Sequence, residues 1–113
     1  MINDKGITQQ MLEVRDELIA LVGERLDIHP NAILSRRRDA RTTMARHIVM
    51  WSLYKATEAS TTQIGAMMGR DHASVVYAIG EVYNNMTMPY HKQLREILTE
   101  ISDKYIYEEK ERN

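Results

Sequence analysis

Apolar side chains recur at intervals of three and four residues along most of this chain, and few residues interrupt the pattern. From Thr8 to Leu26 the apolar positions share one helical face, and charged residues occupy the other faces. Only two prolines and five glycines punctuate the 113 residues, and no segment alternates as a half-buried strand does. The pattern therefore predicts an all-α fold with five or six helices.

Breaks in the pattern divide the chain into helical segments. We expect helices over about 8–26, 32–35, 43–57, 61–68, 71–85 and 90–107. Thr8, Ser60 or Thr61, and Asp71 are suitable N-caps, and Gly69 suits the end of a helix. The side chains expected to face the core in the third and fifth helices are Met44, Ile48, Trp51, Leu53, Tyr54, Val75, Val76, Ile79 and Val82. Residues 36–41 lack apolar periodicity and are expected to form an exposed loop.

Composition excludes several classes of protein. The chain has no cysteine, so it has no disulfide, no thiolate nucleophile and no thiolate metal site. It also lacks an apolar run of the roughly 20 residues that span a bilayer, and its N-terminus lacks the apolar core of a signal peptide. We expect a cytoplasmic protein with one domain over 1–107 and a polar tail over 108–113. The initial methionine followed by an ordinary helix favours a complete small protein.

The histidines do not suggest a metal site or a catalytic centre. His29, His47, His72 and His91 are 18, 25 and 19 residues apart, so no two lie one helical turn apart. Asp71 and His72 are adjacent at the start of a helix, face different ways and have no evident nucleophile beside them. We therefore expect no enzyme, no metal and no cofactor.

Charge is distributed unevenly along the chain. Seven basic residues lie between Arg36 and Arg70 against two acidic ones, a net +5, which leaves −6 for the rest of a chain whose total is −1. A basic block of this kind is typical of a surface that binds a polyanion, although a solvated loop is the alternative. Most of the block is arginine, whose planar fork suits phosphate, guanine edges and a narrow minor groove.

Residues 60–85 have the lengths and the break of a helix-turn-helix. A short helix is followed by a turn that contains Gly69 and then by a longer helix. In that motif the first residues of the second helix enter the major groove. Here they are Asp71, His72, Ala73 and Ser74, which are small or polar and suit contacts with base edges and a phosphate.

The run from Gly69 to Ile79, GRDHASVVYAI, closely resembles the signature of the C-terminal DNA-binding domain of the bacterial replication initiator DnaA. Upstream, residues 33–38 resemble the basic loop of that family, 45–50 the start of its next helix, and 63–65 its first helix-turn-helix element. The resemblance covers roughly residues 11–101. It implies a Trp-repressor-like arrangement of helices and binding to double-stranded DNA.

The resemblance also implies roles for single residues. Arg38 is the best match to the arginine that enters the minor groove, and Arg37 and Arg36 are the other choices. Asp71 and His72 match the pair that reads bases in the major groove. The complete set of expected DNA-binding residues is Arg36, Arg37, Arg38, Arg41, Arg46, His47, Lys55, Thr61, Thr62, Arg70, Asp71, His72, Ala73 and Ser74.

Within that set, Ala73 and Ser74 stand where the family has two threonines that contact a thymine methyl and a phosphate. Arg46, with His47 beside it, matches a position that contacts the DNA backbone. Thr61 and Thr62 fall where the helix-turn-helix of the family touches phosphate.

Gly80 and Glu81 stand where the family often has basic residues, and this departure leaves a second interpretation open. In addition, no phosphate loop of an ATPase can be built from the glycines of the chain. We expect a free-standing DNA-binding module, of bacterial or phage origin, that is linked to replication initiation or its regulation. The alternative is an adaptor that binds the full-length initiator or another protein and has weak or no DNA binding. Neither interpretation involves a nucleotide or a membrane.

Overall fold

The computed structural model describes residues 5–89 and 91–106, and within them it confirms the all-α fold, with no strand. The elements are α1 (Gln9–Leu26), α2 (Pro30–Ile33), α3 (Ala40–Ala56), α4 (Thr61–Met68), α5 (His72–Met86), α6 (Lys92–Ile101) and the π-helical turn η2 (Ser102–Ile106). None of these helices is both long enough and apolar enough to span a membrane.

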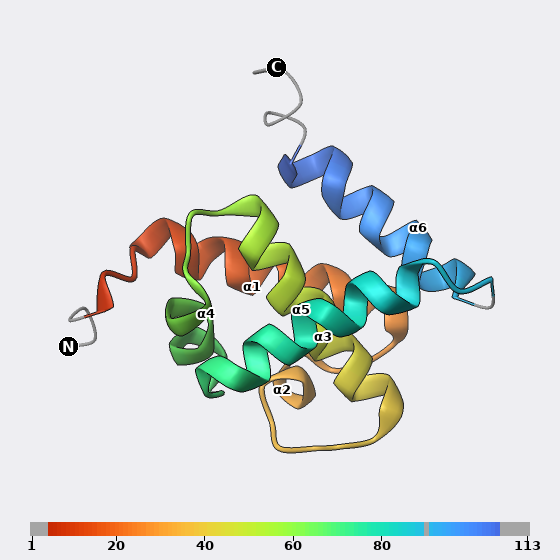
Figure 1. The fold of residues 1–113 in the computed structure, drawn as a ribbon, viewed down its shortest axis with the longest axis horizontal. Helices are drawn as coiled ribbons and strands as arrows, with labels where there is room; N and C mark the ends of the chain where they lie inside the picture. The colour runs from red at the N-terminus through yellow and green to blue at the C-terminus, as the bar shows by residue number, and fades with distance from the viewer. Residues whose placement is uncertain (1–4, 90, 107–113) are drawn as a thin grey trace.

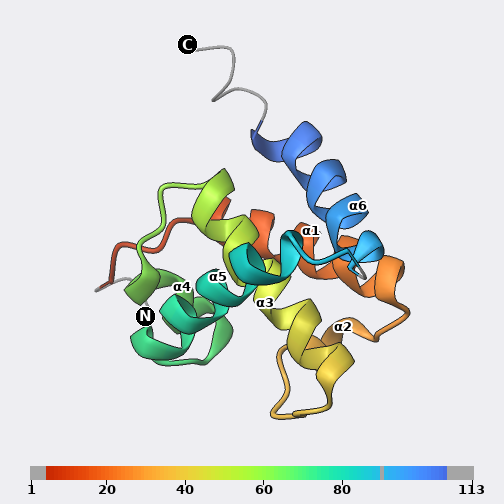
Figure 2. The same cartoon turned by 45° about the vertical axis from the view of Figure 1, so that its right-hand side comes forward.

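Helix α3 is the centre of the fold, because it contacts all five other α-helices and η2. Figures 1 and 2 show α5 crossing over it and α1 behind it. Ile48, Val49 and Leu53 of α3 have no exposed surface. Burying such side chains contributes about 1.5–3 kcal/mol each, so α3 anchors both the basic segment before it and the helix-turn-helix after it.

The predicted caps are formed by side chains that satisfy free amides at helix starts. The Thr8 hydroxyl accepts from the amide of Met11 at 3.1 Å. Ser60 and Gln63 form a reciprocal capping box, with bonds of 3.1 and 2.8 Å between side chain and backbone. These bonds fix where α1 and α4 begin, as expected from the sequence.

Helix α3 begins three residues before the expected position. The Asp39 carboxylate accepts from the amide of Thr42 at 3.1 Å and from its hydroxyl at 2.9 Å, so it caps the helix. The exposed loop therefore covers residues 34–39, and Arg41 lies in the first turn of α3. We call residues 34–39 the arginine loop.

Two side chains that we expected in the core are exposed. Val76 is 50% exposed and Tyr54 is 46% exposed. The buried face of α5 is formed by Val75, Ala78 and Val82, which places Val76 about 100° away from that face. The last helix is also shorter than expected, because α6 ends at Ile101 and continues as η2. Tyr90, the expected start of that helix, and residues 107–113 lie outside the described residues.

The turn of the helix-turn-helix depends on two glycines. Gly69 ends α4 with a φ of 68°, a left-handed conformation that glycine adopts without strain. Gly65 accepts a hydrogen bond from the amide of Arg70 at 2.8 Å. A Cβ on Gly65 would lie 2.4 Å from the carbonyl oxygen of Arg70, so α4 and the turn approach too closely for any other residue.

Gly65→Ala and Gly80→Ala make a matched pair because both glycines are in helices but only Gly65 is crowded. A Cβ on Gly80 meets nothing within 4 Å. We expect Gly65→Ala to lower the free energy of unfolding by about 1–3 kcal/mol. Gly80→Ala should raise it by about 0.5–1 kcal/mol. Urea denaturation measures both values, and an unchanged stability for Gly65→Ala would contradict this packing.

Candidate nucleic-acid interface

The arginine loop presents three arginines to solvent between α2 and α3. It lies at the lower edge of the molecule in Figures 1 and 2, and α6 with η2 lies at the upper edge. Arg36, Arg37 and Arg38 are all exposed. Arg37 pairs with Asp39, with 3.0 Å between Nε and Oδ1. Arg36 and Arg38 are thus the more available cations of the loop.

The first turn of α5 exposes the four residues that were predicted to reach DNA, Asp71, His72, Ala73 and Ser74. Asp71 caps α5, since its Oδ1 accepts from the amide of Ser74 at 2.7 Å. This hydrogen bond holds the pKa of the Asp71 carboxyl below its usual value. The carboxylate is therefore ionised at neutral pH and acts only as an acceptor.

His72 is tied to the start of α4. Its Nδ1 lies 2.7 Å from the hydroxyl oxygen of Thr61. This hydrogen bond engages one ring nitrogen and fixes the ring, while the residue remains exposed. The phosphate contact predicted for Thr61 stays a prediction, and in the structure its hydroxyl bonds to His72. Thr62 beside it is exposed.

The arginine loop and the first turn of α5 face each other across a hollow of about 510 Å³. Its lining residues are Arg36, Arg37, Arg38, Thr43, Arg46, Gly69, Arg70, Asp71 and Ser74. A second hollow of about 350 Å³ is lined by Arg46, His47, Met50, Arg70, Asp71, Ala73, Ser74 and Tyr77. The fold thus brings most of the predicted residues to one surface from three elements.

Three of the predicted arginines donate hydrogen bonds to backbone carbonyls of the protein itself. Arg46 is 5% exposed, and its Nε donates to the carbonyl of Ile33 at 2.8 Å. Arg70 donates through Nη2 to the carbonyl of Ser35 at 2.7 Å. Arg41 donates through Nε to the carbonyl at the end of α1 at 2.7 Å. A phosphate contact by Arg46 stays a prediction, and its side chain is the most buried of the three.

Burial lowers the pKa of both Arg46 and Arg70. The charge of Arg70 lowers the pKa of Arg46 further, and the charge of Arg36 does the same to Arg70. The ordinary pKa of arginine lies so far above neutrality that both stay cationic. The surface is therefore positive even where its arginines are partly covered.

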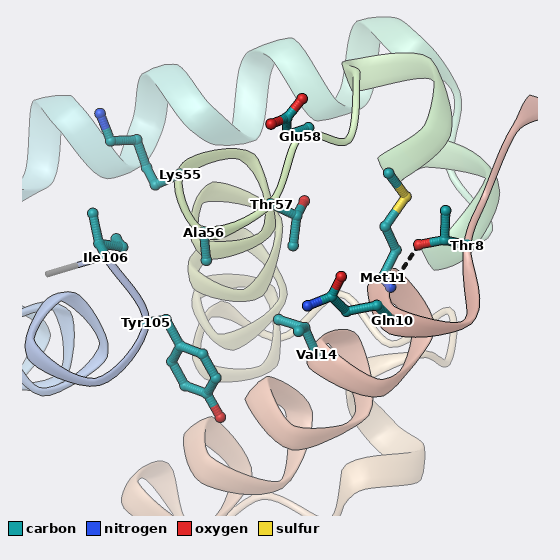
Figure 3. A pocket seen from close by; sticks show the side chains of 10 residues that line it. All are labelled: Thr8, Gln10, Met11, Val14, Lys55, Ala56, Thr57, Glu58, Tyr105 and Ile106. Atoms are coloured by element: carbon teal, nitrogen blue, oxygen red, sulfur yellow. Dashed lines mark hydrogen bonds between the residues drawn. The ribbon is translucent and has the colours of Figure 1, made fainter. Parts of the chain in front are cut away.

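Lys55 lies at the other end of α3 from the arginine loop. It follows Arg41 by 14 residues, which is about 21 Å along a helix. Figure 3 shows it beside a hollow of about 520 Å³, together with Thr8, Met11 and Tyr105. This hollow shares no lining residue with the two at the arginine loop. The structure does not bring Lys55 together with the other predicted residues.

The comparisons with known proteins identify the family. A family model described as the bacterial dnaA protein helix-turn-helix matches residues 15–82. The chain belongs to the DnaA helix-turn-helix family. The match includes every residue predicted to bind DNA.

Individual relatives agree with this assignment. The chromosomal replication initiator protein DnaA of Herpetosiphon aurantiacus is 30% identical over 73 residues, which are 64% of this chain and 16% of the relative. The protein of the same name from Bacteroides thetaiotaomicron is 33% identical over 64 residues, which are 56% of this chain and 14% of the relative. The chain thus spans about a sixth or less of the length of these DnaA proteins.

A crystal structure of a DNA replication initiation factor has the same fold. It superposes with a TM-score of 0.72 and 24% sequence identity, over 86% of this chain and 30% of the other. At that identity the likeness shows the fold alone.

Within the described residues there is no group of three or more histidine, aspartate or glutamate side chains that would hold a metal ion.

Tyr77 is a surface residue that the sequence analysis did not single out. It is 62% exposed, and its ring makes a T-shaped contact with the ring of His47, with 5.9 Å between the centroids. Burial lowers the pKa of His47, so this ring is neutral at neutral pH. Tyr77 follows Ala73 by one helical turn, and that spacing was the available signal that both share the outward face of α5.

Substitutions of Asp71 test its role as the N-cap of α5. Asp71→Ala removes the acceptor for the Ser74 amide and should lower the free energy of unfolding by about 1 kcal/mol. Asp71→Asn keeps a capping oxygen and should stay within about 0.5 kcal/mol of the parent. Urea denaturation measures both. An equal loss for the two variants would mean that the capping bond is not what Asp71 contributes.

The contact between Thr61 and His72 predicts a defined orientation of the imidazole ring. We expect one side-chain rotamer of His72 in the parent and in Thr61→Ser, which keeps the hydroxyl. Thr61→Val removes the partner of Nδ1 and should allow several rotamers. Scalar couplings and nuclear Overhauser effects measured by NMR distinguish these cases. The same rotamer distribution in all three proteins would contradict the hydrogen bond.

Proposed function

We propose that this chain is a non-enzymatic module that binds double-stranded DNA sequence-specifically at a box of the DnaA type. In this proposal α5 lies in the major groove and Arg38 enters the adjacent minor groove. The observation that carries it is that the arginine loop and the exposed first turn of α5 face each other across one positively charged hollow. Membership of the DnaA helix-turn-helix family supports the same conclusion.

The surface has a hollow between the two elements that we propose read the grooves. Adjacent major and minor grooves are separated by one sugar-phosphate strand, so a protein that reads both must accommodate that strand between its two reading elements. The hollow of about 510 Å³ lies in that position. Arg36, Thr43 and Ser74 line it and supply donors suited to phosphate oxygens.

Arg38 is favoured over Arg37 as the residue in the minor groove. The Arg37 guanidinium already bonds to Asp39, and leaving that partner costs part of the gain from DNA. Arg38 is exposed and lines both the hollow of about 510 Å³ and a third hollow of about 650 Å³ between α3, α5 and α6. Arginine suits the negative potential of a narrow, A·T-rich minor groove.

Glu81 limits how strongly the surface attracts DNA of any sequence. It lines the hollow of about 650 Å³ together with Arg38, His47 and Tyr77, at the edge of the proposed interface. A carboxylate near phosphate repels it, so less of the affinity comes from charge alone. Binding then depends more on the direct contacts of Arg38, Asp71 and His72 with bases.

The biological role that we propose follows from the relatives. Those relatives are chromosomal replication initiator proteins, and this chain corresponds to a small part of their length. We infer that the module acts at the boxes that an initiator recognises, where it competes with or assists that initiator.

Fluorescence anisotropy tests the proposal on two labelled duplexes, one with a DnaA-type box and one scrambled, over a series of salt concentrations. We expect tight, salt-dependent binding with a clear preference for the box. Arg38→Ala should lose roughly 1–3 kcal/mol on the box and little on the scrambled duplex.

Lys55→Ala is the matched control, because it also removes one positive charge but lies at the far end of α3. We expect it to change box binding by less than about 0.5 kcal/mol. Equal losses of affinity for the box from Arg38→Ala and Lys55→Ala would mean that DNA does not bind at the surface proposed here. No binding of the parent to either duplex at low salt would refute DNA binding and favour a protein adaptor.

A further inference from the structure

The arginine loop is held in place by hydrogen bonds rather than by apolar packing. Its one large apolar side chain, Leu34, is 39% exposed. Its backbone carbonyls instead accept bonds from two guanidinium groups on different elements. Arg46 reaches it from α3, and Arg70 reaches it from the turn between α4 and α5.

Arg46 extends from α3 to the backbone of the arginine loop. Its Nη2 donates to the carbonyls of Ser35 at 2.9 Å and of Arg37 at 3.1 Å. Its Nε donates to the carbonyl of Ile33 at the end of α2. One buried side chain therefore fixes the backbone on both sides of Arg36.

Arg70 reaches the same loop from the helix-turn-helix. Its Nη2 donates to the carbonyl of Ser35 at 2.7 Å, and its Nη1 donates to the carbonyls of Met68 and Gly69 at 3.3 and 3.2 Å. Arg46 and Arg70 thus converge on a single carbonyl oxygen, that of Ser35. Hydrogen bonds from a charged donor are about twice as strong as neutral ones, so this oxygen joins the loop firmly to the turn before α5.

This arrangement brings two positive charges together in a partly buried place. Burial lowers the pKa of each guanidinium, and each is also near another arginine charge. Apolar side chains would hold a loop without that repulsion. The arginine pair instead provides a rigid link of fixed length between the two elements that face the hollow.

We propose that Arg46 and Arg70 are positioning residues that hold the Ser35 carbonyl between them and so set the distance between Arg38 and the first turn of α5. This inference rests on the proposed function, and it differs from a phosphate contact by either residue. Without the link the loop is free to shift, and Arg38 no longer enters the minor groove in register with His72 in the major groove.

A double-mutant cycle on DNA binding tests the inference. Arg70→Lys keeps the positive charge but lacks the fork that bonds to three carbonyls. We expect it to weaken binding to the box roughly tenfold in the parent and less than about twofold in the Arg38→Ala background. A residue that contacts DNA by itself would weaken binding equally in both backgrounds.

A second readout uses single base-pair changes in the box. The pairs whose discrimination disappears in Arg38→Ala define the part that Arg38 reads. Arg70→Lys should lose discrimination at those pairs and keep it at the others. Arg15→Lys is the matched control, because Arg15 bonds to the carbonyl of Met67 at 2.8 Å but does not touch the loop. Arg15→Lys should keep the discrimination of the parent at every base pair of the box.

The outcomes separate the inference from the proposed function. Equal loss from Arg70→Lys in both backgrounds, or uniform loss of discrimination, would overturn the inference while DNA binding stands. If the parent shows no preference for the box, the proposed function fails and the inference fails with it. Arg46→Lys is measured in the same way, so that one unfolded variant does not end the test.

Discussion

The proposed interface depends on the two hydrogen bonds that meet at the carbonyl oxygen of Ser35, one from Arg46 and one from Arg70. This oxygen lies just after the end of α2, at the start of the arginine loop, and Arg70 of the turn before α5 bonds to it. An exposed loop with three arginines would repel itself and move freely in solution. Here two further arginines fix it, and the cost of burying them is offset by the carbonyls that they satisfy.

Stability and the proposed function depend on the same element. Helix α3 provides much of the core through Ile48, Val49 and Leu53, and it also carries Arg46 toward the loop. The helix-turn-helix rests on α3 through α5. A change that shifts α3 would therefore alter the distance between the arginine loop and α5. The hollow beside Lys55 and Tyr105 lies at the other end of α3 and shares no lining residue with the hollows at the arginine loop (Figure 3).

The sequence predicts those parts of the molecule that local chemistry determines. Caps such as Thr8 and Asp71 were expected because a capping side chain bonds to an amide only a few residues away. The start of α3 was placed too late because Asp39 lies within a run of arginines that reads as a loop. The same locality explains why the helix-turn-helix was placed within about one residue of its observed bounds.

The connections of the arginines could not be predicted in this way. Arg46 and Arg70 bond to a carbonyl 11 and 35 residues away, and no periodicity or spacing indicates such a partner. The sequence therefore offers no means to distinguish the basic residues between 36 and 70 that contact DNA from those that bond to the protein. The fold separates them into exposed cations such as Arg38, arginines that brace the loop, and Lys55 at a distance from both.

Titration of the nitrogen-15-labelled protein with a box duplex, followed by amide NMR, tests most directly whether the arginine loop and α5 form one DNA-binding surface. The account predicts that the largest shifts occur together, in residues 36–39 and 70–77, and follow one binding curve. Residues around the hollow beside Lys55, such as Thr8 and Met11, should stay unchanged. Shifts centred on that hollow, or on α5 without the arginine loop, would contradict the account.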